Sequence, residues 1–244
     1  MILQTEFSDL GTPRKGKVRD IYDLGDQLLF VATDRVSAFD VVLPTGIPDK
    51  GRVLTQLSLY WFRTMEPFMK NHVIESDVEK FPSKLAKYAD QLRGRSMLVT
   101  KAKVVPAECV VRGYLAGSGW KDYKETGSIC GIPILKGLGE SAKLAQPIFT
   151  PTTKADVGHD MNVSFDELKG LVGASLAEML REKSIGLYQR ASEIAEKRGI
   201  IMDYLNTLDW NKTYPGPDLP ADIVEKTRAR YLEIYRILTG KELG

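Results

Sequence analysis

One stretch of the sequence, residues 104–120, joins an apolar strand pattern, a single arginine and a glycine-rich loop. The apolar part, Cys109–Tyr114, contains Arg112, and the following loop carries Ser118 between two glycines. A guanidinium that forks onto two oxygens, helped by a hydroxyl and loop N–H groups, suits a phosphate monoester. The alternative is a buried arginine held in a structural salt bridge, and the residues alone leave both readings open.

Near the N-terminus, cations alternate with other residues around Gly16. Side chains two apart on a strand project to one face, so Lys17 and Arg19 are placed to reach one polyphosphate. A glycine beside them lets a ligand approach the backbone. The segment lacks the Walker A pattern, and a solvated basic edge strand is the interpretation that these few residues alone favour.

A third polar segment, Thr33–Asp40, directly follows an apolar run. Its hydroxyls, carboxylates and guanidinium have the chemistry to bind the amine and carboxylate of an amino acid. A strand-end turn capped by Asp34 and Ser37 explains the same residues without a ligand.

The fourth segment, Pro151–Asp160, places His159 beside two carboxylates in a glycine-containing loop. Such a setting can hold a base or bind a substrate amine, although a capped surface loop is the simpler interpretation. No set of three metal ligands can be assembled around His159. We interpret the other histidine, His72, as structural, and Cys109 as a small core residue rather than a nucleophile.

These segments need a scaffold, and the hydrophobic pattern predicts one that is rich in strands first and in helices last. Strands are expected at Val18–Tyr22 and Leu28–Ala32, joined by a tight turn, and then at Met97–Val105 and Cys109–Tyr114. Residues 113–151 contain many glycines and prolines and are expected to form functional loops.

Helices are predicted from apolar spacing and from end signals. The first contains Leu54 and Met65 and stops before Pro67. Ser164 and Glu167 have the spacing of a capping box that opens a second helix. A long helix then ends at Gly199, and a last one ends at Gly240. This order of elements predicts an α+β fold rather than alternating βαβ units.

Composition excludes several classes of protein. The formal net charge is +2, and no aromatic and basic platform is evident, so we expect no nucleic-acid partner. No apolar run approaches a bilayer span and no secretory signal is visible, so no membrane partner is expected. Two cysteines are too few for a disulfide framework, which indicates a cytoplasmic protein. A homo-oligomer stays open.

At the residue level, the chain resembles the SAICAR synthetase family, also called phosphoribosylaminoimidazole-succinocarboxamide synthase. The family's first characteristic motif is matched throughout Val104–Ser118. Further similarity lies in four segments: Gly16–Tyr22, Ala32–Asp40, Gly51–Leu54 and Ile148–Asp160. The resemblance runs from about Lys15 to Ile201 and resumes in the last helix, and a motif of this length is far more specific than a short glycine pattern.

The resemblance implies a ligase of purine biosynthesis that joins L-aspartate to carboxyaminoimidazole ribotide with ATP and Mg²⁺. It implies a two-lobed, kinase-like or ATP-grasp-like α+β fold with the nucleotide between the lobes. The N-terminal nucleotide-binding lobe is expected at residues 1–105 and the substrate lobe, with the C-terminal helices, at 106–244.

The resemblance also assigns roles to single residues. The ATP phosphates are expected to contact Lys15, Lys17, Arg19, Lys101 and Lys154. The ribotide phosphate is assigned to Arg112 and Ser118, and the aminoimidazole to Asp160 with His159. Ser37 and Asp40 are expected near the aspartate or the imidazole carboxylate. Lys17, His159 and Asp160 form the expected catalytic set.

The sequence departs from the family after Ile201. Family members continue into two strands that carry magnesium-binding carboxylates, whereas here Met202 begins a segment that resembles a later helix. Several tens of residues of the family therefore have no counterpart in this sequence. No paired carboxylates elsewhere in the sequence replace the family's magnesium-binding carboxylates. We expect the natural polypeptide to contain such a segment, and an intact mass of 27.2 kDa would contradict this.

Overall fold

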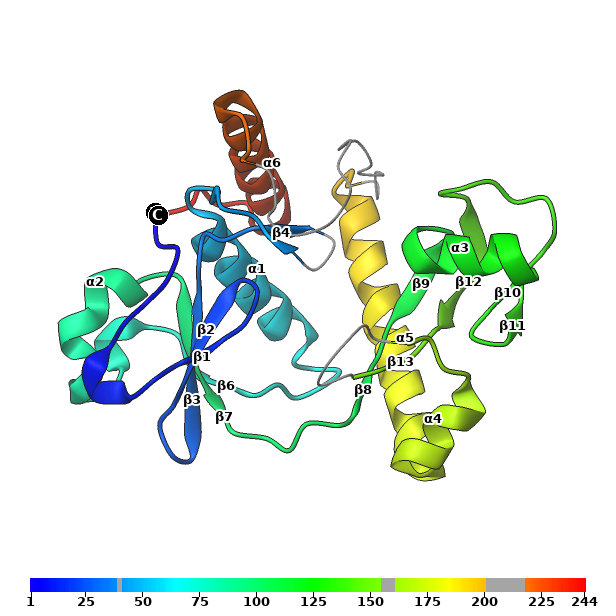
Figure 1. Ribbon diagram of the computed structural model, residues 1–244, viewed down its shortest axis with the longest axis horizontal. Coiled ribbons are helices and arrows are strands. Elements are labelled where there is room, and N and C mark those ends of the chain that lie inside the picture. Colours follow the sequence, from blue (N-terminus) through cyan, green and yellow to red (C-terminus); the bar gives the residue numbers. More distant parts are fainter. Residues whose placement is uncertain (39–40, 155–160, 201–217) are drawn as a thin grey trace. The chain divides into compact units, whose positions relative to one another are not determined.

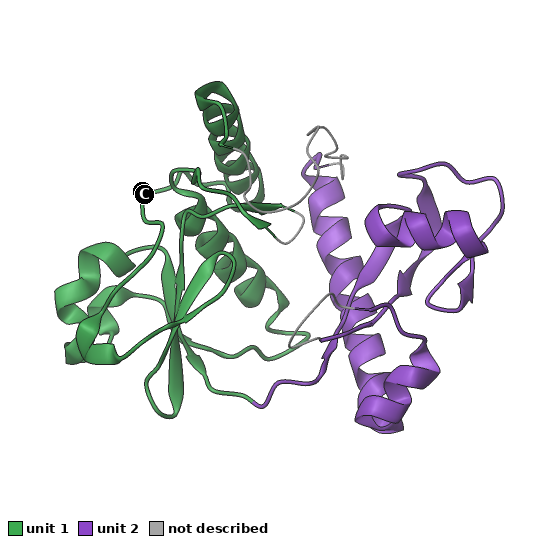
Figure 2. Ribbon diagram, in the orientation of Figure 1, with its two compact units in different colours: residues 1–102, 205–244 green, residues 103–204 purple. Residues whose placement is uncertain are grey.

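The computed structural model describes residues 1–38, 41–154, 161–200 and 218–244 and divides the chain into two compact units. Unit 1 comprises residues 1–102 and 205–244, and unit 2 comprises residues 103–204 (Figures 1 and 2). The first boundary lies three residues from the expected one at 105, but the last helix belongs to unit 1 instead of the substrate lobe. No helix in the described ranges is both long enough and apolar enough to span a membrane.

Unit 1 is built on a five-stranded antiparallel sheet in the order β1-β2-β3-β7-β6. Its strands are β1 (Arg14–Lys15), β2 (Arg19–Asp23), β3 (Gln27–Ala32), β6 (Val73–Glu75) and β7 (Ser96–Thr100). A separate two-stranded pair consists of β4 (Ser37–Ala38) and β5 (Val41–Val42). Its helices are η1 (Ser8–Leu10), α1 (Lys50–Met65), η2 (Val78–Lys80), η3 (Ser83–Tyr88), α2 (Ala89–Leu92) and α6 (Ala221–Thr239).

The alternation of side chains along β2 and β3 gives the sheet two different faces. Tyr22 and Leu29 point to one face, into a core that includes Phe7 and Leu85. Phe30 and its neighbours on the other face pack beneath α1. One face of the sheet is therefore covered by short helices, and the other packs against α1.

Helix α6 packs along α1, far from it in sequence (Figure 1). At the N-terminal end of α1, Asp49 adopts a left-handed backbone with φ of 63°. The Asp49 carboxylate accepts two bonds from the Arg228 guanidinium of α6, at 3.1 and 2.7 Å. This contact links the last helix to the N-terminal unit.

Unit 2 combines short strand pairs with three helices in its described part. Its strands are β8 (Ala107–Glu108), β9 (Val111–Tyr114), β10 (Ser128–Ile129), β11 (Ile132–Pro133), β12 (Lys143–Phe149) and β13 (Thr152–Thr153). Its helices are α3 (Gly117–Thr126), α4 (Phe165–Val172) and α5 (Ala174–Lys197). The pair β9–β12 packs against α5, and Gly113 makes this possible: a Cβ there would lie 2.0 Å from the Tyr188 hydroxyl of α5.

Most sequence-based predictions of elements are confirmed. The hairpin of β2 and β3 is present, and the Ser164–Glu167 capping box opens α4. The helix before Pro67 and the helix ends at Gly199 and Gly240 are found within one or two residues. The mixed composition of strands and helices confirms the α+β class.

Three predictions are wrong. Residues 113–151 contain α3 and the seven-residue β12 rather than loops alone. β7 ends at Thr100, five residues earlier than expected. Cys109 is exposed and is not a core residue, because the strand begins only at Val111.

Candidate functional site

Arg112 of β9 lies across the start of α3 and is held there by three uncharged oxygen partners. Its Nη2 donates to the Ser118 hydroxyl at 2.7 Å, and its Nη1 donates to the Ala116 carbonyl at 3.2 Å. Its Nε donates to the Thr150 hydroxyl at 3.1 Å. The register of β9 with β12 places Ile148 opposite Arg112, which brings Thr150 within reach just beyond the strand.

The first turn of α3 forms the other wall of this site, which we call the arginine cradle (Arg112, Ala116–Gly119 and Thr150). Ala116 is the N-cap of α3 and supplies no side-chain hydrogen bond to its first turn. The unbonded N–H groups and the positive end of the helix dipole favour an anion there. Gly119 allows the close approach, because a Cβ would lie 3.0 Å from Cδ and Nε of Arg112.

The charge of Arg112 has no counter-ion among the described residues. Burial lowers the pKa of the guanidinium, and the Cys130 thiol and the Asp122 carboxylate act in the opposite sense. The structural salt bridge that the sequence left open is therefore not formed in the described parts of the chain. A bound anion would compensate the partly buried charge of Arg112. The donors of the cradle suit the phosphate monoester that the sequence predicted.

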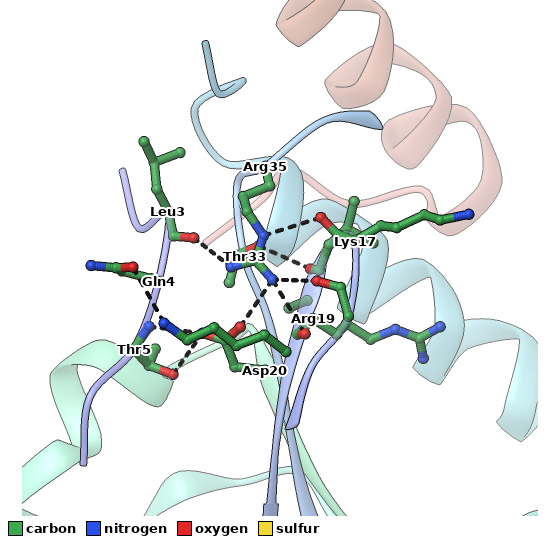
Figure 3. Close-up of polar contacts among 12 residues, drawn as sticks. Leu3, Gln4, Thr5, Lys17, Arg19, Asp20, Thr33 and Arg35 are labelled. Atoms are coloured by element: carbon green, nitrogen blue, oxygen red, sulfur yellow. Dashed lines mark hydrogen bonds and ion pairs between the residues drawn. The ribbon is translucent and has the colours of Figure 1, made fainter. Parts of the chain in front are cut away.

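The second basic site lies in unit 1, in the turn of residues 16–19 between β1 and β2. Gly16 N–H donates to the Arg19 carbonyl at 2.8 Å and closes this turn. Figure 3 shows the side chains of Lys17 and Arg19 extending to the same side, away from the N-terminal residues Leu3–Thr5. β1 is indeed an edge strand, yet the two cations share a side as the polyphosphate hypothesis requires.

Arg35, in the polar segment after β3, is occupied by partners within the protein. Its guanidinium donates to four backbone carbonyls and to the buried Asp20 carboxylate. Asp34 is equally occupied, since its side chain accepts from Ile2 N, Gly51 N and Arg95 Nη1. Asp34 and Arg35 thus hold distant parts of unit 1 together, which differs from the local turn cap that the alternative interpretation predicted.

The remaining predicted residues are dispersed. Lys15 Nζ donates to Gln4 at 3.4 Å, so it lies with the N-terminal segment. In unit 1, Lys101 pairs with Asp23 at 2.6 Å, and in unit 2, Lys154 pairs with Glu108 at 3.3 Å. Ser37 lies in β4 and is half-buried. The other predicted residues, Asp40, His159 and Asp160, lie outside the described residues.

A cavity of about 290 Å³ opens between the sheet of unit 1 and α1. Its walls are mainly apolar and include Phe30, Leu57 and Trp61, with Arg19 and Arg95 as its cations. The Arg19 guanidinium lies 5.8 Å from the centre of the Phe30 ring, within the range of a cation–π contact. The described residues contain no group of three or more His, Cys, Asp or Glu side chains suited to a metal ion.

Sequence reasoning missed two parts of the arginine cradle, Thr150 and Gly119. Nothing local marks Thr150, which is fully buried and meets Arg112 only through the pairing of distant strands. Gly119 was read as part of a loop, whereas a glycine in the first turn of a helix signals close approach of another group.

The chain is similar to known proteins both in sequence and in structure. A sequence profile described as SAICAR synthetase matches residues 12–204. The phosphoribosylaminoimidazole-succinocarboxamide synthases of Geobacter sulfurreducens and Geobacter metallireducens are each 49% identical over 291 residues, covering 99% of this chain and 98% of those proteins. The structure of the Saccharomyces cerevisiae SAICAR-synthase complexed with SAICAR is similar with a TM-score of 0.87 at 35% identity, covering 99% of both chains. The bacterial alignments exceed the 244 residues of this chain by 47, so the relatives carry residues that have no counterpart here.

Proposed function

The chain belongs to the SAICAR synthetase family, and on that premise we propose which of its residues carry the reaction. The enzyme is an ATP-dependent ligase that joins L-aspartate to the carboxylate of carboxyaminoimidazole ribotide. The products are SAICAR, ADP and phosphate, and the step belongs to de novo purine biosynthesis.

The observation that supports the ribotide half of the proposal is the uncompensated charge of Arg112. The phosphate monoester of the ribotide is a dianion of the right geometry for a guanidinium, a serine hydroxyl and helix N–H groups. In the proposed complex, Ser118 and the first turn of α3 bind the phosphate beside Arg112. Thr150 keeps the guanidinium in the plane that this contact needs.

The ATP half of the proposal rests on the turn of residues 16–19. Lys17 and Arg19 extend to one side and are assigned to the phosphates of ATP. Lys101 and Lys154 are assigned there as well; their ion pairs with Asp23 and Glu108 are exposed and cost little to exchange for a phosphate. Lys15 is retained as a weaker contributor, and Ser37, Asp40, His159 and Asp160 are assigned to the aspartate and aminoimidazole groups.

The chemistry follows from the reactivity of the carboxylate. A carboxylate is a poor electrophile, so one of its oxygens first attacks the γ-phosphorus of ATP, the bond to the β-phosphate oxygen breaks, and ADP leaves. The aspartate amine then attacks the acyl carbon, phosphate leaves, and the amide loses a proton. Positioning of charged ligands is the main task, and such alignment is worth about 7–11 kcal/mol of barrier.

Mg²⁺ belongs to the proposal as the companion of the ATP phosphates. The described residues do not fit a protein-built metal site, since they hold no cluster of three suitable ligands. No step of the proposed chemistry is assigned to the ion. The positive charges of Lys17 and Arg19 would offset part of the negative charge on the γ-phosphoryl group.

The decisive experiment measures ADP release with carboxyaminoimidazole ribotide in the presence and absence of L-aspartate. Release that depends on aspartate, with SAICAR formed in equal amount, supports the ligase. Release without aspartate would indicate a kinase-like phosphotransferase, and ATP binding without turnover would indicate a non-catalytic nucleotide-binding protein. Neither alternative is favoured by the relatives.

We propose a cytoplasmic location, supported by two free cysteines in a chain without disulfides among its described residues. A homo-oligomer is retained as a proposal, and sedimentation of the purified enzyme tests it.

A further inference from the structure

The Arg35 guanidinium is surrounded by backbone carbonyls from the turn of residues 16–19. Nη2 donates to the carbonyls of Gly16 at 2.8 Å and Arg19 at 3.2 Å, and Nε donates to that of Lys17 at 3.1 Å. Nη1 donates to the carbonyl of Leu3 in the N-terminal segment. Figure 3 shows Arg35 at the centre of these contacts. One side chain thus holds three of the four carbonyls of the turn.

The position of Arg35 is itself fixed by the buried carboxylate of Asp20. Its Nη2 is 2.9 Å from Oδ1 of Asp20, whose side chain is fully buried. Oδ2 of Asp20 accepts from the N–H and the hydroxyl of Thr5, at 2.8 and 3.0 Å. Only 13% of the Arg35 side chain is exposed, so the guanidinium has little freedom to move. Arg35 therefore acts as a rigid point to which the turn is attached.

The contacts of Arg35 determine what the turn presents to its other side. A carbonyl oxygen carries partial negative charge and would repel a polyphosphate. Arg35 draws the oxygens of Gly16, Lys17 and Arg19 toward itself, while the side chains of Lys17 and Arg19 extend away from the Leu3–Thr5 segment. The turn consequently offers its cations to a ligand and turns its acceptors inward.

We propose that Arg35 is a positioning residue for the nucleotide phosphates, which orders the backbone of the 16–19 turn without touching the ligand. This inference rests on the proposed function, because it takes ATP as the ligand of that turn. Lysine is not an adequate substitute at position 35. A single ammonium has three donors on a flexible stem, whereas the planar guanidinium makes five fixed contacts here.

The test compares Arg35→Lys with Arg228→Lys. Arg228 is a matched control because it also pairs with a carboxylate of unit 1, that of Asp49, and none of its described contacts is to the turn. ADP affinity is measured by calorimetry, which needs no turnover, and KM values are measured for ATP and for the ribotide. We expect Arg35→Lys to weaken ADP binding and raise the KM for ATP by about ten- to hundredfold, as misplacement of binding groups does. The KM for the ribotide should stay unchanged, and Arg228→Lys should change stability only.

Arg35→Lys with wild-type ADP affinity would overturn the proposal. Equal loss of ADP and ribotide affinity would also overturn it, since this is the pattern of general destabilisation. If Arg35→Lys does not fold, Asp20→Asn replaces it. That variant keeps the shape of the side chain but removes the charge that faces Arg35, and a folded Asp20→Asn protein that binds ADP like the wild type contradicts the proposal.

Failure of the proposed ligase activity can be distinguished from failure of the proposed role of Arg35. Wild-type enzyme that binds ADP but shows no aspartate-dependent turnover refutes the proposed ligase activity, while the ratio of ADP affinities still decides the role of Arg35. Wild-type enzyme that does not bind ADP refutes both.

Discussion

The two basic regions of this protein use an arginine in opposite ways. In unit 1, the Arg35 guanidinium donates to backbone carbonyls and to the Asp20 carboxylate. Its charge is therefore neutralised within the protein, and its hydrogen bonds order the backbone. In unit 2, the contacts of Arg112 with described residues are two hydroxyls and one carbonyl, so its charge has no anionic partner among these and remains available to a ligand. The partners of an arginine, rather than its presence in a motif, therefore indicate whether it binds a ligand or supports the residues that do.

Arg112→Ala is the substitution with the largest expected effect, and it tests whether the charge of Arg112 serves a ligand. Loss of a charge-assisted contact to a phosphate should cost about 2–3 kcal/mol, or about a hundredfold in ribotide affinity, with ATP affinity nearly unchanged. Calorimetry with each ligand measures both effects. Arg181→Ala is the control, since Arg181 of the same unit already has an anionic partner in Glu178. Equal loss of ribotide and ATP affinity would assign Arg112 a structural role.

Gly119→Ala should displace the guanidinium without removing it. The new Cβ would lie 3.0 Å from Cδ and Nε of Arg112, closer than such contacts normally come. We expect the KM for the ribotide to rise about tenfold, because alignment and not charge is lost. Gly170→Ala is the matched control: its Cβ meets nothing within 4 Å, and alanine in helix α4 should stabilise the protein slightly. An unchanged KM in Gly119→Ala would show that the cradle tolerates a shifted arginine.

Thr150→Val should produce a smaller effect of the same kind. It removes the hydroxyl that accepts from Arg112 Nε at 3.1 Å and leaves the other two partners in place. One neutral acceptor is worth about 1 kcal/mol, which corresponds to about fivefold in ribotide affinity. Steady-state kinetics at varied ribotide concentration measures it, and a loss as large as that of Arg112→Ala would mean that Thr150 contacts the substrate.

The smallest expected effect concerns a third arginine, Arg228, whose charge is neutralised by Asp49. The hydrogen bond from Arg228 lowers the pKa of the Asp49 carboxyl below its ordinary value of 3.8. A lowered pKa in the folded state stabilises the protein above the unfolded value and loses this effect as the pH falls through the folded value. Wild type should therefore exceed Asp49→Asn by about 0.5 kcal/mol in unfolding free energy near pH 7, a discounted figure for a partly exposed pair. Urea unfolding across pH 2–7 would contradict this if the difference stayed constant below the ordinary pKa.

The sequence predicted the fold where periodicity and end signals are local. The hairpin of β2 and β3 and the Ser164 capping box depend on neighbours within a few residues, and both were found. The helix α3 was missed, because three glycines within residues 113–119 favour a loop when read locally. Gly113 and Gly119 instead leave room for the side chains of Tyr188 and Arg112, which come from distant or neighbouring elements that a local reading does not see.

Only part of each site was predictable from the sequence. Arg112 and Ser118 were identified together and are bonded, and Lys17 and Arg19 share a side as expected. The role of Arg35 was not predictable, since a guanidinium in a polar strand-end segment equally suits a ligand. Its actual partners are main-chain carbonyls of residues 16, 17 and 19, and no sequence pattern records where a carbonyl points.

The return of α6 to unit 1 has a consequence for biosynthesis on the ribosome. Unit 2 lies within the sequence of unit 1, as an insertion does, so its residues are all synthesised before those of α6. Domains generally fold as units during translation, and unit 2 can therefore fold while unit 1 still lacks the helix that supplies Arg228. Helix α1 of the nascent chain must therefore remain without its partner helix until α6 has been synthesised. Stalled or truncated chains should accordingly expose the α1 surface that α6 covers, and chaperones or proteases would encounter that surface first.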